Sequence, residues 1–119
     1  MISCEKEPIK LVEGGLYANP REDGIGYTVV KILKIDDNGY HVKRYSNVFK
    51  EIPQKIDVDS LYIIGLDDIK EGEELGIGHL PIGKNNFESW KLTYIEKVEV
   101  KEDELEGYKM WREAKGGYW

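Results

Sequence analysis

An Asn-Gly pair between two β-rich runs constrains the fold of this chain more than any other feature. The run 27–35 reads YTVVKILKI and the run 40–45 reads YHVKRY, with Asn38 and Gly39 just before the second run. Val, Ile and Tyr favour strands. Asn and Gly both tolerate the positive φ angles that a type I′ turn requires. The pattern predicts a β-hairpin with Asn38 and Gly39 as its two loop residues.

This turn also predicts a register for the hairpin. Ile35 is then opposite Val42, on a face that Leu33 shares, and Lys34 is opposite Lys43. Two lysines in direct opposition are mildly unfavourable unless acids on a neighbouring strand relieve them. Because apolar residues of the first strand fall on both of its faces, we expect that strand to be covered on both sides or to carry a bulge.

Length and composition indicate one globular domain, residues 1–119. The chain is 40% hydrophobic and 34% charged, which suits a single core. The one cysteine, Cys4, allows no internal disulfide and fits a reducing compartment. No targeting pattern is present, and the longest nearly apolar run, residues 61–66, is too short to span a bilayer. We therefore expect a cytoplasmic protein with no membrane partner.

Further short runs predict additional strands around the hairpin. They cover residues 9–13, 16–19, 47–52, 61–64 and 92–100. In the run 78–83, Pro81 argues against a central strand, because proline lacks the N–H that pairing on both sides needs. We predict an α+β, mainly β fold: a small twisted antiparallel sheet or a partly open barrel of SH3 or Tudor size, with a C-terminal helix packed on it.

The C-terminal helix is predicted over residues 101–115. Acids fill its first turn and bases lie toward its end, as the helix dipole favours. Leu105, Tyr108 and Trp111 are three residues apart and form an apolar stripe that we expect to pack on the sheet as a lid. Gly107 costs about 1 kcal/mol inside a helix relative to alanine, so it indicates a close approach to another backbone.

The formal charge of −6 is unevenly distributed along the chain. Residues 1–55 carry 9 basic and 8 acidic side chains, whereas residues 56–119 carry 8 and 15. Such an acidic half repels phosphate and attracts basic proteins, which argues against a nucleic-acid partner. We expect a basic protein to bind the glycine-punctuated acidic loop through Asp67, Asp68, Glu71, Glu73 and Glu74. The competing interpretation is a surface that only keeps the protein soluble.

Aromatic side chains form a second group of candidate binding residues. The chain has eight Tyr and three Trp, and amphipathic rings are enriched at interfaces. We assign Tyr27 and Tyr45, on the predicted hairpin, to the binding surface. A Tudor-like cage of rings around a cationic ligand is an alternative. An ordinary core with tyrosine hydroxyls at its surface is the simpler interpretation.

His79 is the candidate for a chemical role, as a base or an orienting donor in the glycine- and proline-rich stretch 76–81. Nothing in the sequence identifies a nucleophile or a partner for it, so we assign no catalytic residues. The glycines of this stretch lack dinucleotide-loop spacing, and the acids before it lack EF-hand spacing. We therefore expect no cofactor and no metal.

Three stretches carry a resemblance to a known family: residues 15–17 (GLY), 76–81 (GIGHLP) and 104–112 (ELEGYKMWR). They resemble parts of an uncharacterised family of small bacterial proteins. That family has no established activity, so the resemblance implies no catalytic residues. In size and acidity the chain is also similar to immunity proteins of bacterial toxin systems.

These observations favour a non-enzymatic protein-binding domain, of the kind in which an acidic immunity or inhibitor protein neutralises a basic partner. A small enzyme that uses His79 in a pocket, or a Tudor-like binder of a cationic ligand, are the alternatives. The sequence leaves the oligomeric state open.

Overall fold

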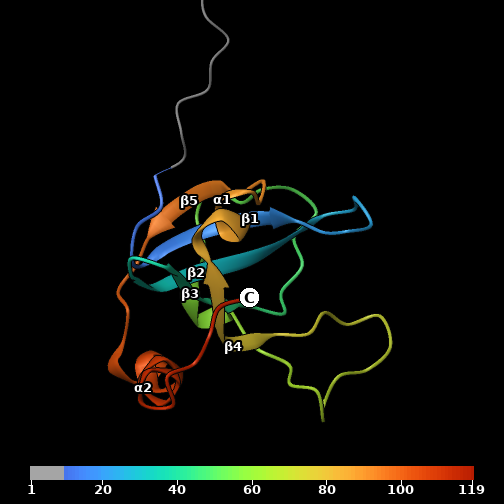
Figure 1. Cartoon of the computed structure of the whole chain (residues 1–119). Coiled ribbons are helices and arrows are strands. Elements are labelled where there is room, and N and C mark those ends of the chain that lie inside the picture. The colour runs from blue at the N-terminus through green and yellow to red at the C-terminus, as the bar shows by residue number, and fades with distance from the viewer. Residues whose placement is uncertain (1–9) are drawn as a thin grey trace, which may run out of the picture.

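A computed structural model describes residues 10–119 and contains one five-stranded antiparallel sheet with the spatial order β4-β3-β2-β1-β5. The strands are β1 (Gly15–Pro20), β2 (Tyr27–Ile35), β3 (Gly39–Arg44), β4 (Ile77–Gly83) and β5 (Thr93–Lys97). The helices are α1 (Lys84–Glu88) and α2 (Glu106–Glu113), with short 3-10 turns η1 (Val58–Ser60) and η2 (Glu102–Leu105). The mainly β, α+β class predicted from the sequence is confirmed, as an open sheet rather than a barrel (Figure 1).

The predicted hairpin forms β2 and β3, but its register differs from the prediction. Ile35 is opposite Tyr40, not Val42. The loop is closed by Asp36, whose Oδ1 accepts hydrogen bonds from the N–H groups of Asn38 (2.8 Å) and Gly39 (3.0 Å). This aspartate turn makes the two-residue type I′ turn unnecessary, so the prediction of that turn is wrong.

Gly39 is required by its neighbours rather than by the turn. Its φ is not positive. A Cβ atom at this position would collide with the carbonyl oxygen of Ile82 and with the ring of Tyr118. The absence of a side chain therefore lets β4 and the end of the chain approach β3.

The predicted bulge and two-sided coverage both occur in β2. The register shifts between Ile32 and Lys34, which places the two residues opposite Val42 and His41. The different turn and the bulge together place Lys31, rather than Lys34, opposite Lys43. A bulge reverses the side-chain alternation beyond it, which sequence periodicity alone does not reveal.

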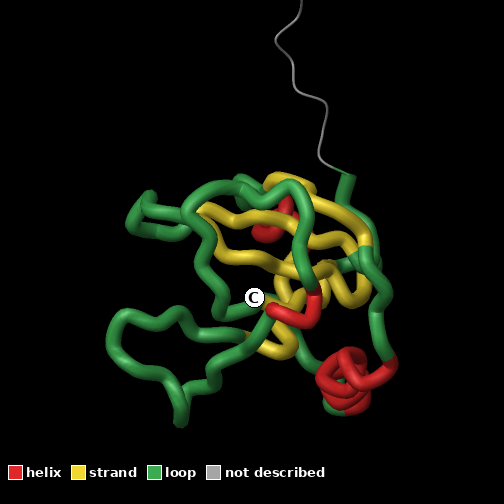
Figure 2. Tube along the Cα trace, turned by 180° about the vertical axis from the view of Figure 1, so that it is seen from behind, coloured by secondary structure: helices red, strands yellow, loops and turns green. Residues whose placement is uncertain are grey.

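Separate apolar clusters cover the two faces of the sheet. The first consists of buried residues from four strands together with α1 and the segment after it: Tyr17, Val30, Ile32, Tyr40, Val42, Ile82, Phe87 and Leu92. The second is smaller, comprising Leu16, Val29, Tyr45 and Ile56. Loop segments, not further strands, lie over the second face (Figure 2).

Three of the predicted strands are not strands in the structure. Residues 10–13 lead into a turn, and residue 9 and Cys4 lie outside the described residues. Residues 47–52 form one isolated bridge, between Phe49 and Tyr27. Residues 61–64 have no ladder either, and Tyr62 is 51% exposed. Individual hydrogen bonds satisfy their backbone instead; for example, Ser46 N–H donates to the Tyr62 carbonyl (2.8 Å).

β4 is an edge strand, as Pro81 predicted. Its outer side is partly covered by the last described residue of the chain. Trp119 N–H donates to the Pro81 carbonyl (3.1 Å), and Gly83 N–H donates to the Trp119 carbonyl (2.9 Å). The end of the chain therefore closes part of an otherwise open sheet edge.

The predicted C-terminal helix is present as η2 followed by α2. Its apolar stripe is only half-buried, because α2 stands beside the β3 and β4 side of the sheet instead of lying across it (Figure 1). Gly107 marks the point of closest approach: a Cβ atom there would lie 2.6 Å from the Cβ atom of His79. The close approach expected at this glycine is therefore confirmed, but to a side chain rather than to a backbone.

Candidate functional site

The acidic residues predicted to bind a partner lie on the segment 57–74, between β3 and β4. Its first part, including η1, lies against the second face of the sheet, and the loop after residue 64 projects from the sheet (Figures 1 and 2). This acidic segment holds seven carboxylates and one lysine, a formal charge of −6, which equals that of the whole chain. Asp67, Asp68, Glu71 and Glu73 are all exposed. A charge equal to the net charge of the chain is therefore concentrated on one segment of the surface.

Large apolar side chains are exposed on the same segment. Leu66 is 78% exposed, Tyr62 51%, Val58 45% and Ile63 38%. Exposed apolar groups among charged ones are typical of protein-interaction surfaces, because only a partner removes them from water.

Hydrogen bonds of Ile64 close the base of the projecting loop, residues 65–75, and join it to Ser46. Ile64 N–H donates to Ser46 Oγ (2.7 Å), and Gly76 N–H donates to the Ile64 carbonyl (3.0 Å). At the tip, Asp68 N–H donates to the Gly65 carbonyl (3.1 Å) in a turn. These contacts give the segment a defined shape, so less conformational entropy is lost when a partner binds.

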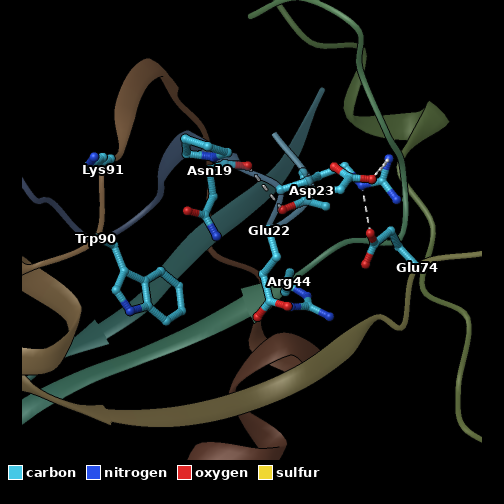
Figure 3. Close-up of a pocket in the computed structure, with 10 residues that line it drawn as sticks. Asn19, Glu22, Asp23, Arg44, Glu74, Trp90 and Lys91 are labelled. Atoms are coloured by element: carbon cyan, nitrogen blue, oxygen red, sulfur yellow. Dashed lines mark hydrogen bonds and ion pairs between the residues drawn. The ribbon is translucent and has the colours of Figure 1, made fainter. Parts of the chain in front are cut away.

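Glu74, the fifth predicted acid, differs from the other four because it is half-buried beside a cavity of about 690 Å³ (Figure 3). The floor of the cavity continues the first core face with polar side chains, Asn19, Thr28 and Arg44. Trp90, which packs on the core, lies on the other side of the cavity (Figure 3).

The arginines of this cavity are engaged within the protein. Arg21 Nε donates to Glu74 Oε1 (2.7 Å), and Arg21 Nη1 donates to the Ile25 carbonyl (3.1 Å). The hydrogen bond to Glu74 is the main cause that raises the Arg21 pKa. Arg44 donates through Nε and Nη2 to the Leu75 carbonyl (3.2 and 2.8 Å). The cavity is therefore a polar junction that ties the acidic segment to the sheet.

The two histidines, 38 residues apart in sequence, lie in contact on neighbouring strands. His41 Nδ1 is 2.8 Å from His79 Nε2, and the rings stack with centroids 5.1 Å apart. His41 Nε2 is 2.8 Å from Tyr118 Oη and 3.3 Å from Asp36 Oδ2. The Tyr118 hydroxyl also donates to Asp36 Oδ2. We call these four residues the histidine cluster.

One assignment of protons satisfies every contact in the histidine cluster. Because the Tyr118 hydroxyl donates to Asp36, its oxygen accepts from His41 Nε2–H. His41 Nδ1 is then an acceptor, and His79 Nε2–H donates to it.

The electrostatics of the histidine cluster favour neutral imidazoles. Burial lowers the pKa of His41, which is completely buried, against the opposing effect of Asp36. Burial and the neighbouring His41 lower the pKa of His79. Burial works to raise the pKa of Asp36, but hydrogen bonds led by that from Tyr118 hold it below its ordinary value. Burial, with the bond to Asp36, raises the pKa of Tyr118.

The aromatic residues chosen from the sequence do not form an open cage. Tyr45 is 7% exposed in the second core cluster, and Lys43 Nζ lies 5.1 Å from its ring centroid. Tyr27 is half-buried and its backbone pairs with Phe49. Rings do enclose one side chain, that of His41. Its ring centroid lies 4.4 Å from that of Trp111, 4.6 Å from that of Tyr108 and 5.3 Å from that of Tyr118.

A buried ion triad ties η2 to the second face of the sheet. Glu104 Oε1 lies 2.8 Å from Lys31 Nζ, and its Oε2 lies 3.1 Å from Lys43 Nζ. Burial alone would raise the Glu104 pKa, but the hydrogen bonds from Lys31, from the Lys101 backbone and from Lys43 lower it. The lysine pair across β2 and β3 is thus relieved by an acid from η2, not from a neighbouring strand. The triad borders a second cavity of about 320 Å³.

Sequence reasoning missed most of these contacts. Asp36 and Tyr118, 82 residues apart, gave no local signal for a polar cluster. The sequence contained a weak signal for the triad, because two lysines in direct opposition on the hairpin need a neighbouring acid. Nothing in the sequence identified Glu104 as that acid. Among residues 10–119, no three His, Cys, Asp or Glu side chains are grouped as a metal site requires.

The comparisons with known proteins add no functional information. No protein-family model, curated protein or solved structure matches the chain. Within the described part of the chain, no helix has the length and apolar character to cross a membrane. What can be said of function therefore rests on the geometry of the acidic segment, the cavities and the histidine cluster.

Proposed function

We propose that the chain is a non-enzymatic protein-binding domain whose acidic segment, residues 57–74, docks on a basic surface of another protein. One observation carries the proposal: this segment combines a formal charge of −6 with four exposed large apolar side chains. The charge steers a basic partner during encounter, and the apolar groups supply burial once contact is made. An immunity or inhibitor protein in the cytoplasm is the specific role we propose.

The two alternative functions have less support. His79 borders neither of the two cavities described above, and its Nε2 faces His41 instead of open space. A base for a bound substrate needs a site beside it that can hold the reacting group. A Tudor-like site needs rings that are open to a cation, whereas the rings around His41 enclose the protein's own imidazole.

Neutralising the acidic segment tests the proposal directly. In the test variant Asp67, Asp68, Glu71 and Glu73 are replaced by Asn or Gln. The matched control neutralises four other exposed acids outside the segment: Asp37, Glu51, Glu106 and Glu113. Both variants change the net charge equally, so they separate the effect of this surface from that of overall charge.

Each immobilised protein is presented with extract of the source cell, and the amount of every retained protein is measured at low and high salt. We expect a basic protein to be retained by the wild type and the control variant but not by the test variant. Retention should weaken as salt screens the charges, over a Debye length of about 10 Å at 0.1 M. A Leu66→Ser variant should also fail to retain the basic protein. Equal retention by the test and control variants would contradict the proposal.

A further inference from the structure

The histidine cluster joins the C-terminal segment to the sheet. His41 and His79 belong to β3 and β4, whereas Tyr118 belongs to the end of the chain. The contacts of the same segment extend along both strands, because Trp111 packs against the His41 ring and Gly107 lies against His79. A change in the charge of the two histidines therefore acts directly on the contacts that hold residues 106–119.

The hydrogen bond between the two rings can form when at most one ring is positively charged, and it is lost when both rings are. With one hydrogen between His41 Nδ1 and His79 Nε2, the 2.8 Å contact is an ordinary hydrogen bond, whether or not one ring is charged. If both rings are protonated, both facing nitrogens carry hydrogen, so the bond is lost and two positive charges stand side by side. At this separation, with little water around His41, their repulsion is strong.

The other groups around the pair do not remove this conflict. Asp36 offers one negative charge on the side of Nε2, and one charge balances one proton only. Tyr118 stays neutral over the range in which histidine titrates, because its pKa is raised. Lys34, 5.9 Å from the Tyr108 ring centroid, adds a further positive charge nearby. The second proton therefore has no counter-charge in the docked arrangement.

We propose that the histidine pair is an acid-sensitive latch, and that protonation of both rings releases residues 106–119 from the sheet. Release lets the rings turn apart and become hydrated, so their pKa values return toward the ordinary value of about 6.5. Both pKa values are lowered in the docked state. The released state thus binds more protons, and it becomes more populated as the pH falls below about 6.5.

Release has a structural consequence at the sheet edge. The hydrogen bonds between Trp119 and β4 would break, which frees the Pro81 carbonyl and the Gly83 N–H. Unpaired groups of this kind on an edge strand can pair with another extended chain. The latch therefore controls whether β4 is covered by the protein's own C-terminal segment.

Amide hydrogen exchange on the full chain tests the latch. The reporters are the Trp119 and Gly83 amides, which bond across the docked contact, and the control is the Tyr45 amide, which donates to the Val29 carbonyl within the sheet. Exchange is measured at about pH 7.5 and about pH 5, on either side of the ordinary histidine pKa. Asp36 stays charged over this range because its pKa is lowered.

After correction for the intrinsic effect of pH on exchange, we expect a loss of protection at both reporters on acidification, because the released state binds more protons. Protection at Tyr45 should not change. A His79→Gln variant, which keeps a donor toward His41 but cannot take the second proton, should abolish the loss. Unchanged protection at the reporters, an equal loss at Tyr45, or persistence of the loss in His79→Gln would each overturn the proposal.

If His79→Gln is already undocked at neutral pH, the wild-type protein decides the question. The ring protons of both histidines are then followed by NMR through the same pH range. The latch requires that the second protonation and the loss of protection at Trp119 share one midpoint, and separate midpoints would refute it.

Discussion

The most demanding prediction concerns Glu104, which balances two lysines on the sheet. The side chain of Glu104 is 9% exposed and that of Lys31 is 5% exposed, whereas that of Lys43 is 21% exposed and can reach water. Glu104→Gln keeps the shape of the side chain and one acceptor oxygen but removes the charge. Lys31 is then left as a buried cation without a counter-charge, opposite a second cation.

Removing one member of a buried ion pair typically costs 3–5 kcal/mol. Because glutamine keeps an acceptor and Lys43 can turn outward, we expect a loss of about 3 kcal/mol in the free energy of unfolding. For a domain of this size that lowers the melting temperature by roughly 10–20 °C. Urea unfolding followed by fluorescence measures the loss. Glu102→Gln is the matched control, since this exposed acid of the same turn pairs with exposed Lys109, and its replacement should change stability very little.

The pH dependence provides a second check on the same residue. The pKa of Glu104 is lower in the folded protein than its ordinary, unfolded value of 4.5. Its stabilising effect is therefore fully present above that value and is lost as the pH falls through the folded pKa. The stability difference between wild type and Glu104→Gln should shrink accordingly in acid. A Glu104→Gln protein that unfolds like Glu102→Gln, or a difference that does not change with pH, would refute the role of the triad.

Two further predictions concern single contacts. Gly107→Ala should destabilise the protein despite a helix-propensity gain of about 1 kcal/mol, because the new Cβ atom would lie 2.6 Å from the Cβ atom of His79. The control is Gly78→Ala, whose Cβ atom would meet nothing within 4 Å. Urea unfolding should change much less in this control than in Gly107→Ala. Burial and the hydrogen bond to Glu88 raise the pKa of Tyr40 to about 12. Glu88→Gln should lower the Tyr40 pKa measured in an NMR titration. An unchanged pKa would mean that burial alone raises it.

Local chemistry made part of the fold predictable. The hairpin follows from two β-rich runs with a turn between them, and the edge position of β4 follows from a proline that cannot pair on both sides. The part of the acidic segment after residue 64 was predictable as a loop because glycines interrupt it and charge dominates it. Each of these inferences uses the preferences of residues that are close in sequence.

The exact hairpin register was not predictable, for a physical reason that involves two particular residues. Asp36 caps the turn with its own side chain and so displaces the two-residue turn that Asn38 would favour. The bulge after Ile32 then shifts the lysines, so that Lys31 becomes the partner of Lys43. Both effects depend on small differences between competing backbone arrangements, and packing against the rest of the protein selects among them.

The sequence by itself determined that the runs on either side of Asn38 are paired strands and where the negative charge of the chain lies, because backbone preference and charge are carried by each residue locally. The tertiary structure alone decided which distant side chains meet. His41 reaches Tyr118 across 77 positions and Lys31 reaches Glu104 across 73. Such contacts are fixed only when register, bulge and strand order have placed both partners, since burying any of these polar groups is favourable only beside the other.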